Sequence, residues 1–157
     1  MIKFIFAILL TVSLAGLSTS AQQKYWTGFY IRERVSGSAN ETCRCELLQS
    51  EEKMDSYLPR VGWPIEKVKP SVDWNKELVI VISPGKSYSG FDLAFSDVKW
   101  TGSEFRLDWG WWDSYRQQYR WSSTSTVGGN RNPKILVVVV RRYVAESYTL
   151  RCSEIGR

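Results

Sequence analysis

Two stretches of the chain are almost entirely apolar and rich in β-branched residues, and they constrain the fold more than any other feature of the sequence. KELVIVIS covers residues 76–83, and KILVVVVRRYV covers residues 134–144. Branched side chains favour strands, and unbroken apolar runs of this length are typical of buried strands. We therefore predict that the first stretch is a central strand. The second is also expected to be buried, with its Lys and Arg residues at the ends.

Other segments alternate between apolar and polar residues, which is the pattern of a strand with one buried face. The clearest is residues 104–112, where every second residue from Phe105 to Trp111 is Phe, Leu or Trp. The short turn at residues 101–103 predicts that this strand forms a hairpin with the one before it. Similar alternation covers residues 29–36, 42–48, 90–100 and 147–152.

These patterns give about eight strands and one helix, and the turn signals between them recur at the spacing of sandwiches and barrels. We predict a mainly β (β-rich α+β) fold, a compact antiparallel sandwich or barrel. The helix is expected near residues 50–58. Ser50 suits the N-cap, Glu51 and Glu52 suit the positive first turn, and Pro59 is expected to end the helix.

The N-terminus has the order of a cleavable signal peptide, with a charge at Lys3, an apolar run over residues 4–17, and small residues up to Ala21. The run has about 14 residues, whereas a membrane-spanning helix needs about 20. We expect a signal peptide over residues 1–21 and a single domain over 22–157 with no membrane span. No cysteine lies near the cut to carry a lipid, so we predict soluble export to the periplasm or outside the cell.

The sequence contains no histidine, which limits the catalytic and metal sites that the chain can form. It excludes Ser-His-Asp and Cys-His nucleophile pairs and every His-containing zinc site, and three cysteines are too few for an all-cysteine zinc site. Gly128 and Gly129 precede a strand, which is the wrong context for a phosphate-binding loop. We therefore expect no enzyme, no metal and no cofactor. The one basic doublet, Arg141-Arg142, ends an apolar run, so nucleic-acid binding is not expected either.

Paired carboxylates are the catalytic arrangement that the composition still allows. Asp108 and Asp113 flank a Trp-rich segment, with Glu104 nearby, and two carboxylates among aromatic residues suit glycoside hydrolysis. The alternation, however, places Glu104 and Asp108 at solvent-facing strand positions. A hydrolase is therefore the least favoured of the functions that we consider.

The three cysteines fit an oxidising compartment and allow one disulfide. Cys43 and Cys45 are two residues apart on a predicted strand, so they point to the same face and do not easily bond to each other. Cys152 lies on the last predicted strand and also faces inward. We predict a disulfide from Cys152 to Cys43 or Cys45. The alternative is three buried thiols that act as small apolar residues.

Residues 109–121 concentrate aromatic and arginine side chains, which dominate binding hot spots and also suit sugar stacking. Trp109 and Trp111 continue the buried face of the preceding strand, so we expect them in the core. The candidates for an interaction surface lie at or beyond the strand end and are Trp112, Tyr115 and Arg116.

A series of short motifs follows residue 72. An Asp-aromatic pair, Asp73-Trp74, precedes the buried strand at residues 78–82, and Gly85 follows it. A turn into a long alternating strand comes next, at Ser89, Gly90 and Phe91. This order resembles the C-terminal domain of the PrcB family of protease-complex subunits, whose turn is Thr-Gly-Gly-Tyr-like. Serine here replaces the first glycine of that turn, and phenylalanine replaces the tyrosine.

The resemblance covers most of the chain after the signal peptide, including Pro133 before ILVVVV and the helix at residues 50–58, but not the Trp-rich residues 109–121. It implies a non-enzymatic exported β domain that associates with a protein, such as a protease, and it adds Ser89, Gly90 and Phe91 to the interaction surface. Our leading hypothesis is an accessory or stabilising subunit of a protease complex. The alternatives are a carbohydrate-binding module that uses the Trp-rich segment, and a small β protease inhibitor.

Overall fold

A computed structural model describes residues 25–35, 43–64, 69–85, 91–120, 134–143 and 148–155. The predicted signal peptide lies outside these residues, as do Ser89 and Gly90. None of the helical structure in the described ranges is long and apolar enough to cross a membrane. The elements of these ranges are β1 (Trp26–Glu33), β2 (Arg44–Leu48), α1 (Glu51–Arg60), β3 (Glu77–Ser83), β4 (Asp92–Trp100), β5 (Glu104–Asp113), β6 (Gln118–Arg120), β7 (Lys134–Arg141) and β8 (Thr149–Glu154).

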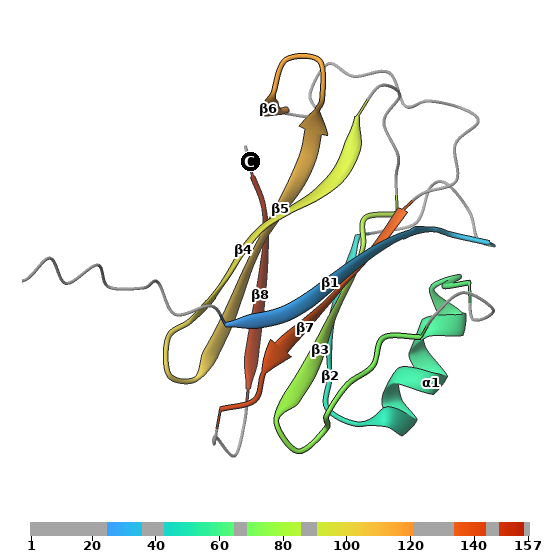
Figure 1. Cartoon of the computed structure of the whole chain (residues 1–157), viewed down its shortest axis with the longest axis vertical. Coiled ribbons are helices and arrows are strands. Elements are labelled where there is room, and N and C mark those ends of the chain that lie inside the picture. Colours follow the sequence, from blue (N-terminus) through green and yellow to red (C-terminus); the bar gives the residue numbers. More distant parts are fainter. Residues whose placement is uncertain are drawn as a thin grey trace, which may run out of the picture.

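The strands form two sheets of four strands each, which are not closed into a barrel (Figure 1). The first sheet has the order β1-β7-β3-β2, and all of its pairs are antiparallel. The second sheet has the order β4-β5-β6, and β8 also pairs with β5. The mainly β prediction is confirmed, and of its two forms the structure has the sandwich.

One pair departs from the antiparallel arrangement that the sequence predicted, because β8 runs parallel to β5. The hydrogen bonds from Thr149 N to Ser103 O and from Ile155 N to Trp109 O flank this pair. The chain reaches β8 from β7, which belongs to the first sheet. No tight turn within the second sheet therefore fixes the direction of β8, and strand direction is a property that alternation does not encode.

The two central strands of the first sheet, β3 and β7, are buried on both faces, which explains the two unbroken apolar runs. On β3, Leu78, Ile80 and Ile82 face the second sheet, and the residues between them face α1. The same division applies to β7, and residues 78–82 and 135–140 are at most 2% exposed. The predictions that residues 76–83 form a central strand and that the second run is buried are confirmed. A strand covered on both sides is therefore a nearly continuous apolar run.

The second sheet is buried on one face only. The side chains of Phe105, Leu107, Trp109 and Trp111 point into the space between the sheets and are at most 3% exposed. This confirms the predicted inward face of β5 and the core positions of both tryptophans. The turn at residues 101–103 joins β4 to β5 as predicted, and Gly102 at its centre has a φ of 99°, which favours glycine.

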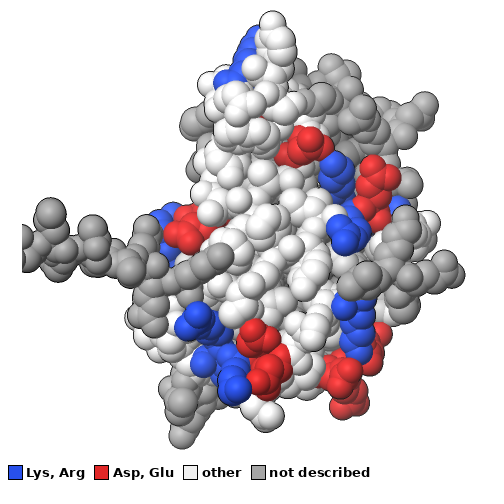
Figure 2. Space-filling model, in the orientation of Figure 1, with Lys and Arg blue, Asp and Glu red and all other residues white. Residues whose placement is uncertain are grey.

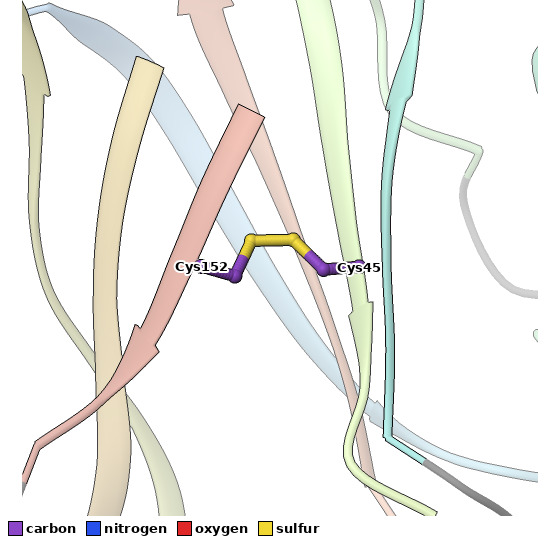
Figure 3. Close-up of a disulfide and its surroundings, with 2 residues drawn as sticks. All are labelled: Cys45 and Cys152. Carbon is purple, nitrogen blue, oxygen red and sulfur yellow. A yellow bond between two sulfur atoms is a disulfide. The ribbon is translucent and has the colours of Figure 1, made fainter. Parts of the chain in front are cut away.

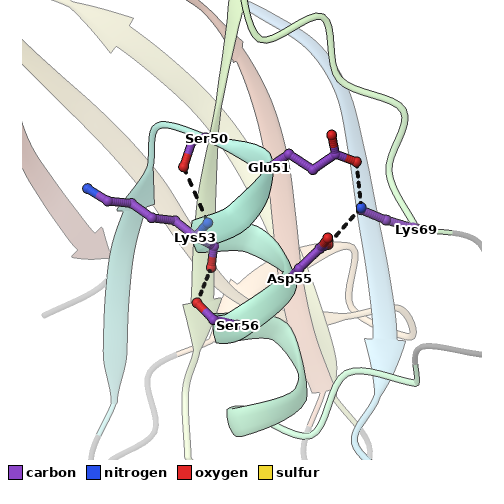
Figure 4. A network of polar contacts seen from close by, with 6 residues as sticks. All are labelled: Ser50, Glu51, Lys53, Asp55, Ser56 and Lys69. Atoms are coloured by element: carbon purple, nitrogen blue, oxygen red, sulfur yellow. Dashed lines mark hydrogen bonds and ion pairs between the residues drawn. The ribbon is translucent and has the colours of Figure 1, made fainter.

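The helix begins as the sequence predicted. Ser50 caps it, because its Oγ accepts a hydrogen bond from Lys53 N at 3.3 Å (Figure 4). Lys69, from the connection that follows the helix, places its Nζ 2.8 Å from Glu51 Oε1 and 2.7 Å from Asp55 Oδ1. The hydrogen bond to Asp55, followed by that to Glu51, raises the pKa of the Lys69 ammonium. Lys69 therefore fastens the connection to the helix.

The helix continues two residues beyond its predicted end at residue 58, so the prediction that Pro59 ends it is wrong. Pro59 lies inside α1, and the end comes where Gly62 takes a left-handed φ of 79°. Gly62 N donates to Pro59 O, and Trp63 N donates to Leu58 O, which is the Schellman pattern. Proline removes only the hydrogen bond of its own nitrogen and crowds the preceding turn, so a helix can continue past it at a cost in stability.

A disulfide between Cys45 on β2 and Cys152 on β8 closes one open side of the sandwich (Figure 3). It joins an edge strand of the first sheet to an edge strand of the second. The predicted bridge is confirmed, and the structure selects Cys45 from the two candidates. Cys43 stands just before β2, with its side chain exposed.

Aromatic side chains close the opposite open side, between β1 and β4. The rings of Trp26 and Phe95 meet edge to face with their centroids 5.2 Å apart. The ring centroid of Phe29 lies 5.6 Å from that of Trp26 and 5.5 Å from that of Phe95. Phe29 is 47% exposed. Figure 2 shows that the face over these strands is uncharged in its middle, with charged side chains at its margins. The two sheets are thus joined by a disulfide at one open side of the sandwich and by aromatic contacts at the other.

We expect removal of the disulfide to lower the free energy of unfolding by about 4–5 kcal/mol, because the bond closes a loop of about 100 residues. Cys152→Ser is the test variant, and Cys43→Ser is the matched control because its side chain is exposed and lies outside the bond. Guanidinium unfolding measures both. Equal stability of the two variants would contradict the role of the disulfide as a fastening between the sheets.

Candidate functional site

The hairpin of β5 and β6 extends beyond the sandwich. Figure 1 shows its turn at the top, past the ends of the first-sheet strands. Trp111, Trp112 and Asp113 of β5 pair with the three residues of β6, and residues 114–117 form the turn. Figure 2 shows basic side chains on this projection. The hairpin contains all three surface candidates from the Trp-rich segment.

The turn is held by Asp113, which is 7% exposed. Its Oδ1 accepts hydrogen bonds from Tyr115 N at 3.1 Å and from Arg116 N at 3.0 Å. At the far end of the turn, Gln117 takes a left-handed φ of 54°, and its Nε2 donates to Ser114 O at 2.7 Å. An aspartate that binds the amides two and three residues ahead stabilises a tight turn. The tip is therefore an ordered structure.

Tyr115 stands at the tip with 93% of its surface exposed. Arg116 beside it is also exposed. A tyrosine normally buries its ring and leaves only its hydroxyl group in water. Full exposure of the ring, on a turn whose backbone is fixed by Asp113, is therefore unusual. Such a residue presents a large apolar surface that loses little conformational entropy when a partner covers it.

Trp112 and Tyr119 form the base of the hairpin, directly opposite each other on β5 and β6. Their rings meet edge to face with centroids 5.2 Å apart. Tyr119 lies over Gly110, where a Cβ atom would come within 3.0 Å of its Cδ1. Both rings stand on the outer face of the second sheet, opposite the buried tryptophans. The glycine makes room for this aromatic pair.

The structure brings some of the predicted surface residues together and separates others. Trp112, Tyr115 and Arg116 share the hairpin. Phe91 precedes Asp92, the residue that pairs with Trp112, but Phe91 is half-buried against the core between the sheets. Phe91 and Trp112 therefore lie on opposite faces of the second sheet. Ser89 and Gly90 fall outside the described residues.

Tyr119 is a member of the surface that our list of candidates omits. Its position depends on β6, a three-residue strand that is too short to show alternation. The sequence does contain a signal for this pairing, because Trp112 and Tyr119 are equidistant from a four-residue turn. Asp113 at the start of that turn is the residue type that begins such turns.

The carboxylates considered for a hydrolase do not form a pair. Asp108 and Asp113 lie an odd number of residues apart on β5, so they point to opposite faces of the second sheet. Asp108 Oδ1 is 3.2 Å from Arg106 Nε, and Glu104 Oε1 is 3.1 Å from Arg151 Nε. Asp113 holds the turn. The arrangement therefore does not place two carboxylates on either side of one glycosidic bond.

Across the described ranges, no three or more Cys, Asp or Glu side chains are gathered closely enough to hold a metal ion. On the outer face of β5, the Asp108 carboxylate faces cations instead, with its Oδ2 3.8 Å from Lys99 Nζ. The chemistry of this outer face is that of ion pairs and aromatic contacts.

Comparison of the chain with protein-family models, with curated proteins and with solved structures finds no match. The resemblance to the PrcB family therefore stays a prediction from short motifs. The fold and the hairpin geometry are the grounds on which a function can be proposed.

We expect Asp113→Ala to loosen the hairpin tip, because the amides of Tyr115 and Arg116 lose their shared acceptor. Loss of such a capping bond is worth about 1–2 kcal/mol, so these two amides should exchange with solvent roughly tenfold faster. Asp113→Asn is the matched control, since its side-chain oxygen still accepts hydrogen bonds. Hydrogen exchange followed by NMR measures both variants, and equal rates would show that Asp113 does not hold the tip.

Proposed function

We propose that the chain is an exported, non-enzymatic protein-interaction domain and that the β5–β6 hairpin is its docking element. The observation that carries the proposal is the 93% exposure of Tyr115 on a turn held by two hydrogen bonds to Asp113. Tyr, Trp and Arg are the residue types most enriched in binding hot spots, and the hairpin presents all three. Export rests on the predicted signal peptide and agrees with the presence of a disulfide.

The sandwich suits a supporting role for this hairpin. Its two sheets share a core and are fastened on both open sides, so the base of the hairpin belongs to a rigid body. A projecting element on a rigid base binds with less ordering of the chain than a flexible loop. The position of the hairpin beyond the sheets lets it reach into a recess of a partner.

The class of partner comes from the family resemblance. The motifs from Asp73 to Phe91 resemble PrcB-like subunits of protease complexes, so a protease or another subunit of its complex is the proposed partner. On this proposal the domain is an accessory or stabilising subunit. A protease inhibitor would be a close variant, in which the projecting turn enters the cleft of the enzyme.

Capture from the exported fraction, with identification by mass spectrometry, tests this proposal. The wild-type chain should retain a protease or a subunit of its complex. Tyr115→Ala should lower the affinity for that protein about 30-fold, the effect of losing a hot spot of about 2 kcal/mol. Gln118→Ala, at an exposed position on the same hairpin, is the control and should bind as wild type does. Undiminished binding by Tyr115→Ala would refute the docking role of the hairpin.

Glycan binding is the second candidate function, and a separate observation favours it. Trp112 and Tyr119 form an aromatic pair on the outer face of the second sheet. Aromatic rings on such a surface suit contact with the face of a sugar ring. This surface is at the base of the hairpin, whereas Tyr115 is at the tip.

The two functions predict opposite results for two variants. If the domain binds glycans, Trp112→Ala should abolish retention on a glycan array while Tyr115→Ala leaves it unchanged. If it binds a protein through the tip, Tyr115→Ala should have the larger effect on capture of that protein. Absence of any glycan retention by the wild-type chain would remove the second candidate.

A further inference from the structure

All three cysteines of the chain line one cavity. It has a volume of about 450 Å³ and lies at the side of the sandwich that the disulfide closes. Both Cys45 and Cys152 are half-buried, so their bond is not sealed in the core. Trp109, Ser153 and Glu154 complete the lining of the cavity.

The chain has three cysteines, and two of them are joined, so the Cys43 sulfur remains a thiol. Its side chain is exposed, two residues before Cys45 and open to the same cavity. A thiol next to a half-buried disulfide has the arrangement that thiol–disulfide exchange requires, which is a nucleophilic sulfur with access to the bond.

We propose that Cys43, Cys45 and Cys152 form a thiol–disulfide exchange site. The Cys43 thiol loses its proton to solvent, and the thiolate forms a new bond to Cys152 Sγ. The bond between Cys45 and Cys152 breaks, and its electron pair leaves on Cys45 Sγ, which takes up a proton. One disulfide and one thiol are present before and after the step, so it needs no oxidant or reductant.

Cys152 is the sulfur that is attacked, because attack on Cys45 would join Cys43 to Cys45. Residues two apart on an extended chain point the same way with their Cα atoms about 7 Å apart, which exceeds the usual span of a disulfide. Cys152 comes instead from β8, on the other sheet, and its Cα lies 6.3 Å from that of Cys45. Cys43 lies two residues before Cys45 along the chain, so a bond from Cys43 to Cys152 also requires the start of β2 to shift toward β8.

Exchange moves the disulfide between the sheets by two residues, from Cys45 to Cys43 just before the start of β2. Along a strand this is a displacement of about 7 Å. The sandwich then has two covalent forms, which differ in which residue of the first sheet is tied to β8. This property is independent of the hairpin, which lies at the other end of β5 from the start of the β5–β8 pair.

Trypsin places each cysteine in its own peptide, because it cleaves after Arg44 and Arg151. These peptides are residues 35–44, 45–53 and 152–157. The folded chain is held without reductant near pH 8, quenched in acid, alkylated with N-ethylmaleimide and digested. Label on peptide 45–53, together with a disulfide between peptides 35–44 and 152–157, reports exchange.

In the wild-type chain, we expect label on peptide 45–53 to exceed that in Cys43→Ser at least fivefold. The Cys43→Ser variant lacks the attacking sulfur but keeps the native bond, so it measures background reduction. The rate should not change when the protein is diluted tenfold, because the step is intramolecular. Label confined to peptide 35–44 would overturn the proposal, and so would a rate proportional to protein concentration.

A second variant tests the reach of Cys43 directly. Cys45→Ser leaves only Cys43 and Cys152, which should form a disulfide that lowers the intact mass by two hydrogens relative to the reduced chain. If both thiols of Cys45→Ser persist in an oxidising buffer in which the wild-type disulfide forms, the proposal is also overturned.

Discussion

The pairing of β3 with β7 is the interaction on which the rest of the structure depends. These two strands lie at the centre of the first sheet, and their side chains fill both the core against the second sheet and the core against α1. Burial of apolar surface is the main favourable term in folding, and here one strand pair contributes to both cores. The helix, the second sheet and the edge strands each pack on a surface that this pair provides.

The edges of the sandwich serve a different purpose from its centre. Cys45 and Cys152 join the sheets on one side, and the contact of Trp26 with Phe95 joins them on the other. With both sides fastened, the part of β5 that continues past the sheets can project without loosening the core. The same arrangement brings the disulfide to the surface, where Cys43 and the bond line one cavity. The proposed functions therefore lie at the edges of the sandwich, and the shared core lies in its centre.

Local patterns in the sequence predict most of this fold, because a buried face of a strand or helix requires apolar residues at regular positions. The apolar runs of β3 and β7, the alternation of β5 and the cap at Ser50 all follow from contacts within a few residues. The parallel direction of β8 and the choice of Cys45 over Cys43 did not follow, since both depend on how distant strands are placed. The hairpin was half predicted: Tyr115 and Arg116 are exposed where expected, whereas Tyr119 required the register of β6.

Native-state hydrogen exchange tests the division between centre and edge most directly. If β3 and β7 are the centre of the fold, the amides of residues 78–82 and 135–140 should exchange only when the whole chain unfolds. Their exchange free energies should then equal the free energy of global unfolding, while the amides of residues 114–118 exchange through smaller local openings. Exchange of β3 and β7 at free energies well below that of global unfolding would contradict a fold that depends on this pair.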